Sequence, residues 1–308
     1  MSYRLLTYDA VGMPRAGILV ADRVHDGARA TGNPDWSTVL GALADWPAAD
    51  EAFRALASRV ATGLAGGTAL AEVRLLAPIL YPGNIFCAGA NYTDHIDEMF
   101  RIMKQPPGPN MKELGDKPWH FVKTSRASVV GPGTRVPMPA HSAQVDWEVE
   151  LAAVIGRTAK NVAPGDALGI VAGYTIANDL SARDANFRKL NPPTSPFHFD
   201  MLGGKCFEGS CPLGPWIVPA SEIPDPQHLD MKLWINGELM QDSNTGRMIF
   251  DTAEQIAMLS SRITLYPGDV VLTGTPAGVG MGRQRFLKAG DQLKLWIEGI
   301  GELHHGMA

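Results

Sequence analysis

The stretch at residues 146–151 reads DWEVEL and places two acidic residues inside an otherwise apolar run. Glu148 and Glu150 are two positions apart, and side chains at that spacing on a β-strand point to the same face of the sheet. Two neighbouring carboxylates in a low-dielectric setting repel each other unless one is protonated or a cation lies between them. The stretch therefore predicts a buried strand with a cation site on one face.

A third acid follows the next apolar segment along the chain. Asp179 comes just after residues 170–177 and could supply a third carboxylate. Such an oxygen-rich site suits Mg²⁺ or Mn²⁺. Acid pairs of this spacing also occur on solvated strand faces, which is the alternative. The apolar flanks favour the metal site, because buried acids are rare unless they are paired or coordinate a cation.

Length and composition indicate a soluble globular protein with a substantial core. The chain has 308 residues, of which 45% are hydrophobic and 19% charged, and its formal net charge is −5. This negative charge argues against a basic surface that would bind nucleic acid or an anionic membrane. No long apolar run or signal-peptide pattern is present. Three cysteines are more typical of reduced core residues than of a disulfide framework, so we expect a cytoplasmic protein.

The distribution of strand and helix patterns predicts two domains. Residues 3–20 read as two strands, and residues 36–61 show helical spacing interrupted at Pro47, which together predict a small N-terminal β/α domain over residues 1–78. Residues 79–308 alternate short strands with Gly/Pro turns and contain one clear helix at residues 252–262. This predicts an α+β, β-rich domain with a rolled or sandwiched mixed sheet. A dinucleotide fold is not expected, because no G-x-G-x-x-G follows a strand.

Residues 101–118 contain several helix and strand breakers in a row. A long irregular segment in a compact enzyme-sized domain is often a lid or binding loop. A surface insertion without function is an equally open interpretation at this point.

A histidine and a glutamate precede this irregular segment. His95 and Glu98 are three residues apart, so on a helical turn they share a face. A carboxylate that orients an imidazole makes a good general base near neutral pH. The alternative is an exposed turn that happens to carry acids and a histidine.

Two further segments carry candidate binding groups. Lys205 stands among small and apolar residues, where a partly buried ammonium needs a carboxylate or a substrate oxyanion as its partner. A salt bridge that only closes the metal site is the alternative role. The glycine-rich stretch 272–280 follows a strand, and its backbone N–H groups near Gly274, together with Thr275, could hold a carboxylate. It lacks the ending of a P-loop.

Taken together and in this order, these segments resemble the fumarylacetoacetate hydrolase superfamily. The resemblance covers roughly residues 80–305 and rests on six ordered stretches: NYTDH at 91–95, DWEVEL with VIGR at 146–157, GYTIANDLSARD at 173–184, GK at 204–205, PLGPW at 212–216 and LTGTPAGVG at 272–280.

The resemblance implies a rolled mixed β-sheet catalytic domain, usually in a homodimer, and a small-molecule 2-oxo acid substrate, often an acylpyruvate. It also implies a role for each candidate residue. These roles are Mg²⁺ or Mn²⁺ binding by Glu148, Glu150 and Asp179, water activation by His95 and Glu98, catalysis aided by Lys205, and substrate contacts from Thr275, Arg183 and Gly274.

The chain departs from the family pattern near the expected substrate. Members commonly carry glutamine two residues after the Arg-Asp pair, whereas this chain has Asn186. This puts inherited substrate contacts over residues 186–199 in doubt. The proline-rich loop at 103–118 is then the main candidate for specificity, and His120 and Phe121 could reach the pocket or be structural.

The leading hypothesis is a metal-dependent hydrolase that cleaves a C–C bond in a 2,4-dioxo acid from aromatic or sugar-acid catabolism. Within the superfamily, the alternatives are an isomerase of hydroxymuconate-type dienes and a 2-oxo acid decarboxylase acting on oxaloacetate. These reactions need no attacking water. A non-catalytic scaffold that keeps the fold is disfavoured, because the acids and the lysine are all present.

Overall fold

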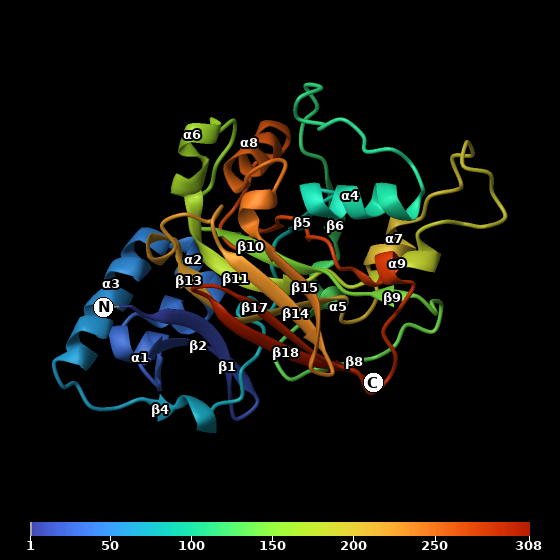
Figure 1. Ribbon diagram of the computed structural model, residues 1–308. Coiled ribbons are helices and arrows are strands. Elements are labelled where there is room, and N and C mark those ends of the chain that lie inside the picture. The colour runs from blue at the N-terminus through green and yellow to red at the C-terminus, as the bar shows by residue number, and fades with distance from the viewer. Residues whose placement is uncertain (1) are drawn as a thin grey trace.

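The computed structural model describes residues 2–308 and is rich in strands (Figure 1). The strands are β1 (Arg4–Ala10), β2 (Met13–Val20), β3 (Arg23–Asp26), β4 (Thr68–Ala69), β5 (Ile85–Ala88), β6 (His120–Lys123), β7 (Val129–Val130), β8 (Arg135–Val136), β9 (Val145–Asp146), β10 (Val149–Ile155), β11 (Val171–Asn178), β12 (Ser181–Ala182), β13 (Cys211–Pro219), β14 (Asp230–Ile235), β15 (Glu238–Asn244), β16 (Val270–Leu272), β17 (Gln292–Ile297) and β18 (Gly301–Met307). The α-helices are α1 (Gly27–Thr31), α2 (Val39–Ala44), α3 (Trp46–Ala61), α4 (Thr93–Ile102), α5 (Ser125–Ser128), α6 (Pro164–Ala167), α7 (Met201–Lys205), α8 (Thr252–Arg262) and α9 (Gly280–Arg283).

Most of these strands form a long mixed sheet and a second, five-stranded sheet, and β9 and β12 pair separately as a two-stranded sheet. The long sheet has the order β4-β3-β2-β1-β13-β11-β10-β16-β5-β6, with β7 beside β13, and the second has the order β15-β14-β17-β18-β8. Most pairs are antiparallel, but β16 and β5 run parallel. The predicted β-rich fold with a mixed sheet is therefore confirmed.

Strand β10 lies inside the molecule, which explains its apolar sequence. All seven of its residues are buried, and it is flanked by β11 on one side and β16 on the other. Leu151 belongs to the core cluster shared with the five-stranded sheet, whereas Val154 belongs to the cluster shared with α2 and α3. Alternate residues of one strand thus face two cores, as the strand period requires.

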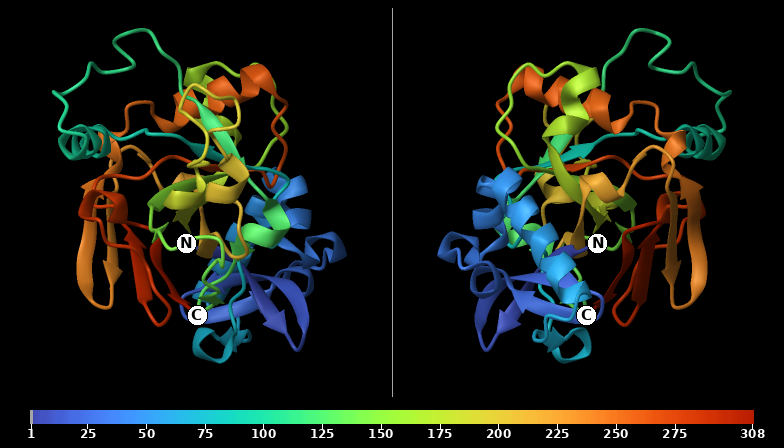
Figure 2. Two further views of the ribbon diagram at one scale, coloured as in Figure 1. Left: turned by 90° about the vertical axis from the view of Figure 1, so that its right-hand side faces the viewer. Right: turned by 90° about the vertical axis from the view of Figure 1, so that its left-hand side faces the viewer.

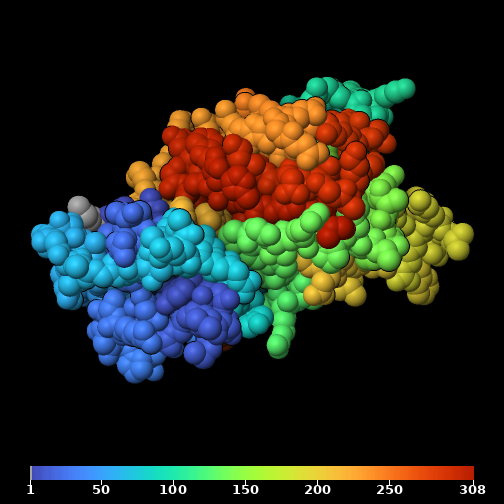
Figure 3. Space-filling model, turned by 90° about the horizontal axis from the view of Figure 1, so that it is seen from below, coloured from blue at the N-terminus to red at the C-terminus, as the bar shows by residue number. Residues whose placement is uncertain are grey.

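The N-terminal strands extend the catalytic sheet rather than forming a sheet of their own. Leu5 of β1 pairs with Ile217 of β13, and Phe53 of α3 shares a core cluster with Leu272 of β16. The N-terminal elements and α4 lie toward opposite ends of the long sheet (Figures 1 and 2), and the N-terminal residues and the C-terminal strands occupy adjacent parts of the surface in Figure 3. The domain boundary at residue 78 remains a prediction.

Local sequence signals account for the helix boundaries. Helix α8 covers the predicted residues 252–262, and Asp251 and Glu254 form a capping box at its start. The predicted interruption at Pro47 is the boundary between α2 and α3, because proline fits the first turn of a helix but not its interior. Within residues 2–308, no helix has both the length and the apolar character needed to cross a bilayer.

Candidate active site

The three predicted metal ligands come together in space. Glu150 is on β10, Asp179 follows β11, and Glu148 immediately precedes β10. Each offers an oxygen atom within 4.8 Å of the others, and all three residues are buried. We call these residues the acid trio.

Glu148 departs from the continuous strand that its sequence predicts. The strand is interrupted at residues 147–148, where the Glu148 N–H donates to the side-chain oxygen of Asn178 at 2.9 Å instead of to a neighbouring strand. Glu150 is therefore held by strand β10, whereas Glu148 is held by the short irregular segment just before it.

Three cationic side chains surround the acid trio. Lys205 Nζ lies 2.9 Å from Glu148 Oε2 and 2.7 Å from Asp179 Oδ2. Lys123 Nζ lies 2.8 Å from the other oxygen of Asp179. Arg183 contacts Glu148 and also donates to Asp146. Counting Asp146, four carboxylates face three cations, so one negative charge has no cationic side chain to balance it.

This arrangement separates the pKa values of the two glutamates. Burial would raise the pKa of Glu148, but Lys205 and Arg183 outweigh it and hold that pKa at about 2. The pKa of Glu150 is raised well above its usual range, by burial and by the carboxylates of Asp179 and Glu148. A divalent cation beside Glu150 would remove this repulsion, so the acid trio could hold Mg²⁺ or Mn²⁺.

The lysine at the acid trio is fully charged. Burial lowers the pKa of Lys205, but the carboxylates of Asp179 and Glu148 outweigh burial and raise it above its ordinary value. The ammonium can therefore stabilise a negative oxygen in the adjoining pocket.

His95 and Glu98 lie on helix α4, as their spacing predicts. The His95 Nδ1 is 3.8 Å from Glu98 Oε2, which is longer than a hydrogen bond, and it has no hydrogen-bond partner. Burial raises the pKa of Glu98, but His95 and the Gly278 N–H, which donates at 3.0 Å, bring it below its usual range. Asp94 also accepts from the Ala277 N–H, so α4 is docked on the glycine-rich loop.

One pocket of about 210 Å³ collects six of the predicted site residues. Its lining includes Glu148, Glu150, Lys205, Arg183, His95 and Thr275. The other three candidates are not part of this lining. Asp179 lies behind Lys205, Glu98 contacts His95 and the glycine-rich loop, and the Gly274 N–H donates to Glu150 Oε2 at 2.6 Å.

Several residues that the sequence pattern did not single out support this site. Lys123 is fully buried against Asp179, and Asp146 accepts from Arg183 and from the backbone N–H groups of Gly280 and Met281. Gln241 accepts from the Val149 N–H and donates to Thr275 Oγ1. A lone lysine ending the apolar segment 120–123 was the one available sequence signal for Lys123.

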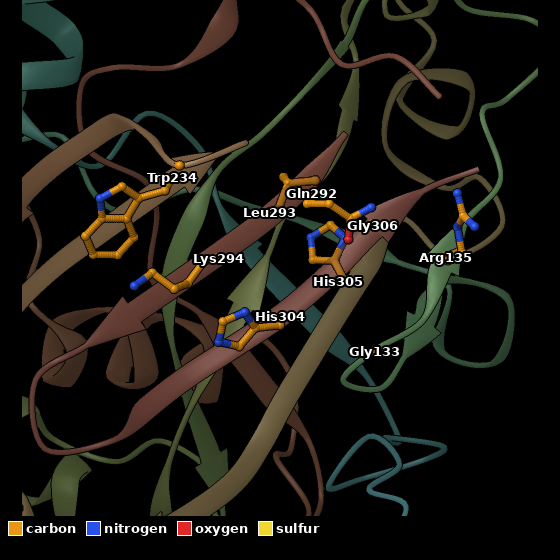
Figure 4. A pocket seen from close by; sticks show the side chains of 10 residues that line it. Gly133, Arg135, Trp234, Gln292, Leu293, Lys294, His304, His305 and Gly306 are labelled. Carbon is orange, nitrogen blue, oxygen red and sulfur yellow. The ribbon is translucent and has the colours of Figure 1, made fainter. Parts of the chain in front are cut away.

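A second hollow of about 410 Å³ lies on the five-stranded sheet and has a different character (Figure 4). Lys294 lies 4.2 Å from the ring centroid of Trp234, and Glu302 pairs with both Lys294 and His304. Figure 4 shows Trp234, Lys294 and His304 on neighbouring strands. Among residues 2–308, the acid trio is the only cluster of His, Cys, Asp and Glu that meets the geometry of a metal site.

The sequence pattern of the family described as fumarylacetoacetate (FAA) hydrolase, C-terminal, matches residues 84–308. The chain belongs to this family. The human mitochondrial oxaloacetate tautomerase FAHD2B is 43% identical over 232 residues, which cover 75% of this chain and 68% of that protein. The family fold and the acid trio therefore agree with the resemblance seen in the sequence.

Solved structures of the fumarylacetoacetate hydrolase family extend the similarity to the whole chain. Maleylpyruvate hydrolase from Sphingobium sp. SYK-6 is 29% identical with a TM-score of 0.74, covering 99% of this chain and 100% of that one, and has also been solved with manganese(II) and pyruvate. The 5-carboxymethyl-2-hydroxymuconate delta-isomerase from Mycobacterium smegmatis is 30% identical with a TM-score of 0.71, covering 99% of each chain. The family thus includes proteins named for hydrolysis, isomerisation and tautomerisation.

Proposed function

We propose that this protein is a divalent-metal-dependent hydrolase that cleaves a C–C bond in a 2,4-dioxo acid of the acylpyruvate type, formed in aromatic or sugar-acid catabolism. One observation carries the proposal. The acid trio and His95 adjoin one pocket of about 210 Å³, so a base and a cation site can act on one small substrate.

Mg²⁺ or Mn²⁺ would be held by Glu148, Glu150 and Asp179. When bound, the cation supplies Lewis-acid polarisation of the substrate's 2-oxo acid oxygens. The manganese(II) and pyruvate in the structure of the Sphingobium maleylpyruvate hydrolase support this use of the acid trio.

The cationic side chains bind the acidic end of the substrate. Lys205 and Arg183 line the pocket, and their charges attract the substrate carboxylate. Thr275 lies on the same lining, with its hydroxyl fixed between Gln241 and the Val149 carbonyl. The Gly274 N–H holds Glu150 in place.

His95 takes the proton from an attacking water. Glu98, whose pKa is lowered, stays ionised near neutral pH and stabilises the imidazolium that this proton transfer creates. The attack on the distal carbonyl forms the bond to oxygen, and the C–C bond then breaks with its electron pair leaving on the pyruvate fragment. His95 returns the proton to that fragment.

The test is turnover of acylpyruvates, fumarylpyruvate, oxaloacetate and a hydroxymuconate-type diene with Mg²⁺ or Mn²⁺, with products identified by NMR. Release of pyruvate and a free acid supports the proposal. His304→Ala is the matched control for His95→Ala, because His304 is exposed on the five-stranded sheet. Equal hydrolysis by wild type and His95→Ala would exclude the role of His95.

Isomerisation or oxaloacetate decarboxylation at the same site is the second candidate. The 43% identity to an oxaloacetate tautomerase favours a reaction of this kind, which needs proton transfer but no attacking water. Carbon dioxide or a shifted double bond, without a free acid, would select this candidate.

We also propose a cytoplasmic homodimer that acts on small molecules. The three free cysteines support a reducing compartment, and the net charge of −5 argues against nucleic acid as a partner. The dimer rests on the family resemblance. Light scattering after size exclusion tests it, and a monomer mass at micromolar concentration would exclude it.

A further inference from the structure

The pocket has two chemically different ends. The acid trio and its cations form one end. The rest of the lining includes the side chains of Trp119, Phe121, Phe199 and Met201, which we call the apolar wall, and the uncharged amide of Asn186. Phe121 marks the junction with the charged end, because its ring centroid is 4.8 Å from Lys205 Nζ. A 2,4-dioxo acid bound at the acid trio through its 2-oxo acid end directs its acyl substituent away from the charges. The apolar wall is the surface left to receive that substituent.

Trp119 is held in position by its neighbours. Its carbonyl accepts from the Gly89 N–H at 3.2 Å, and its indole packs on Gly89 so closely that an added Cβ there would lie 1.9 Å from the ring. The Trp119 and Phe121 ring centroids are 6.2 Å apart. Phe121 is on β6 and Trp119 immediately precedes it, so this half of the apolar wall is held where the chain enters β6 and leaves β5.

Phe199 is held by contacts within its own loop. Phe187 and Phe199 form an isolated bridge, with ring centroids 5.6 Å apart. The Asp200 N–H donates to the Asn186 carbonyl at 2.8 Å, and Arg188 pairs with the Asp200 side chain. This loop and the loop after α4 project from the same end of the molecule (Figure 1).

The apolar wall is incompletely covered. Trp119 is 50% exposed and Phe199 is 52% exposed. Large apolar side chains gathered in a hollow are typical of a binding site for an apolar group, since burial of such surface favours association.

The apolar wall also lacks a partner for a second carboxylate. Lys205 and Arg183 are the only lysine or arginine on the described lining, and both lie against the acid trio, where the proposed function assigns them to the carboxylate of the 2-oxo acid end. A carboxylate placed against Trp119 and Phe199 would lose hydration without gaining a cation.

We propose that the natural acyl substituent is uncharged and apolar, and that Trp119, Phe121 and Phe199 select it. This inference rests on the proposed function and names its substrate class: acylpyruvates with a hydrocarbon acyl group rather than a second carboxylate. Maleylpyruvate hydrolase, by its name, acts on a substrate of the other class.

A pair of matched substrates tests the selection. Butanoylpyruvate and succinylpyruvate have the same carbon skeleton and differ by a terminal methyl or carboxylate. We expect kcat/KM to be about tenfold or more higher for butanoylpyruvate, because each buried apolar carbon adds favourable transfer energy. A higher value for succinylpyruvate would overturn the proposal.

Substitutions in the apolar wall test which side chains select the acyl substituent. Trp119→Lys places a cation in the apolar wall and should reverse the preference for butanoylpyruvate over succinylpyruvate, mainly through KM. Phe199→Ala should reduce that preference without reversing it. Leu190→Ala is the matched control, because Leu190 lies on the same loop as Phe199 but is 99% exposed and is not part of the lining. An unchanged preference in Trp119→Lys would overturn the assignment to Trp119.

A binding experiment separates this inference from the proposed function. Calorimetric titration with Mg²⁺ present compares 2-oxoheptanoate with 2-oxoheptanedioate, which lack the 4-oxo group and are not substrates for hydrolysis. Tighter binding of the monoacid supports the apolar wall even if no acylpyruvate is cleaved, and tighter binding of the diacid overturns it. If acylpyruvates are not turned over but the monoacid still binds more tightly, the proposed hydrolase activity is contradicted and the apolar wall is not.

Discussion

The two hollows of this protein contain similar charged groups in opposite surroundings. At the acid trio, Glu148, Asp179 and Lys205 are buried, whereas on the five-stranded sheet Glu302 and His304 are exposed and Lys294 is half-buried. The exposed His304–Glu302 pair, at 2.8 Å, is closer than the His95–Glu98 pair, at 3.8 Å. Short contact distance alone therefore does not mark a functional pair.

Burial makes the difference between these regions. A charge pair in water contributes little because the solvent screens it, but a buried charge must be balanced by its neighbours. The same substitution should therefore have a large effect at the acid trio and a small one on the five-stranded sheet.

The largest difference in activity is expected between substitutions of Glu148, at the acid trio, and Glu302, on the five-stranded sheet. Glu148→Ala removes a predicted metal ligand, so we expect kcat/KM to fall by about 10³-fold or more. Glu302→Ala should change it by about twofold or less, because Glu302 is exposed. Calorimetric titration with Mg²⁺ and steady-state kinetics measure both. Equal Mg²⁺ binding by wild type and Glu148→Ala would remove the proposed site.

The lysines should differ in their effect on stability. Without divalent cations, Lys205→Met should lower the free energy of unfolding by about 3–5 kcal/mol, because it leaves buried carboxylates unbalanced. Added Mg²⁺ should recover part of this loss. Lys294→Met should cost about 1 kcal/mol or less. Urea unfolding measures these changes, and equal losses in the two variants would contradict the comparison.

The adjacent histidines of β18 should differ in their effect on pH dependence. His305 is buried, and its Nε2 accepts a hydrogen bond from the Asn178 side-chain N–H at 2.9 Å. Burial lowers the pKa of His305 to about 4. In the unfolded chain, the imidazole of His305 binds a proton below a pH of about 6.5, whereas in the folded protein it does so only below about 4. Protonation therefore favours the unfolded chain, and the free energy of unfolding should fall by about 3 kcal/mol as the pH drops through this range.

His305→Gln should flatten this decline, and His304→Gln should leave it unchanged, because His304 is exposed. Urea unfolding at several pH values between about 4 and 7 gives the two slopes. Parallel profiles for wild type and His305→Gln would show that His305 is not the group that titrates.

The smallest of these contrasts is expected between His95 and His304. His95→Ala should lower hydrolysis by about 10²-fold through kcat, since it removes a general base. His304→Ala should have no measurable effect on kcat. Glu98→Gln should show an intermediate loss, because the imidazole remains but its carboxylate partner is gone. A larger loss in His304→Ala than in His95→Ala would reverse the comparison.

The sequence predicted features that depend on neighbours along the chain. Helix α8 was predicted because apolar residues recur at helical spacing over residues 252–262, and the structure adds the capping box of Asp251 and Glu254 at its start. Glu150 and Asp179 were found because each stands at an apolar strand or at its end. The interruption at residues 147–148 was not predicted, because it depends on the Asn178 side chain, thirty positions away.

The supporting groups of the site were beyond sequence reasoning for the same reason. Lys123 reaches Asp179 from β6, and Gln241 reaches Thr275 from β15 of the other sheet. The chain separations are 56 and 34 residues. No local spacing encodes such contacts. The apolar wall likewise combines Trp119 and Phe199 from two irregular segments.

The sequence by itself determined the main strands, helix α8 and the same-face placement of Glu148 and Glu150, with Asp179 as a third candidate, because side-chain periodicity and apolar patterning act over a few residues. The short helices of residues 79–308 and helix α4 were not separated from the surrounding turns by that patterning. Only the tertiary structure decided that three cations face four carboxylates, that Glu150 is left with a raised pKa, and that the far end of the pocket is apolar. Desolvation and Coulomb energies depend on distances through space, and those distances exist only after the sheets have packed.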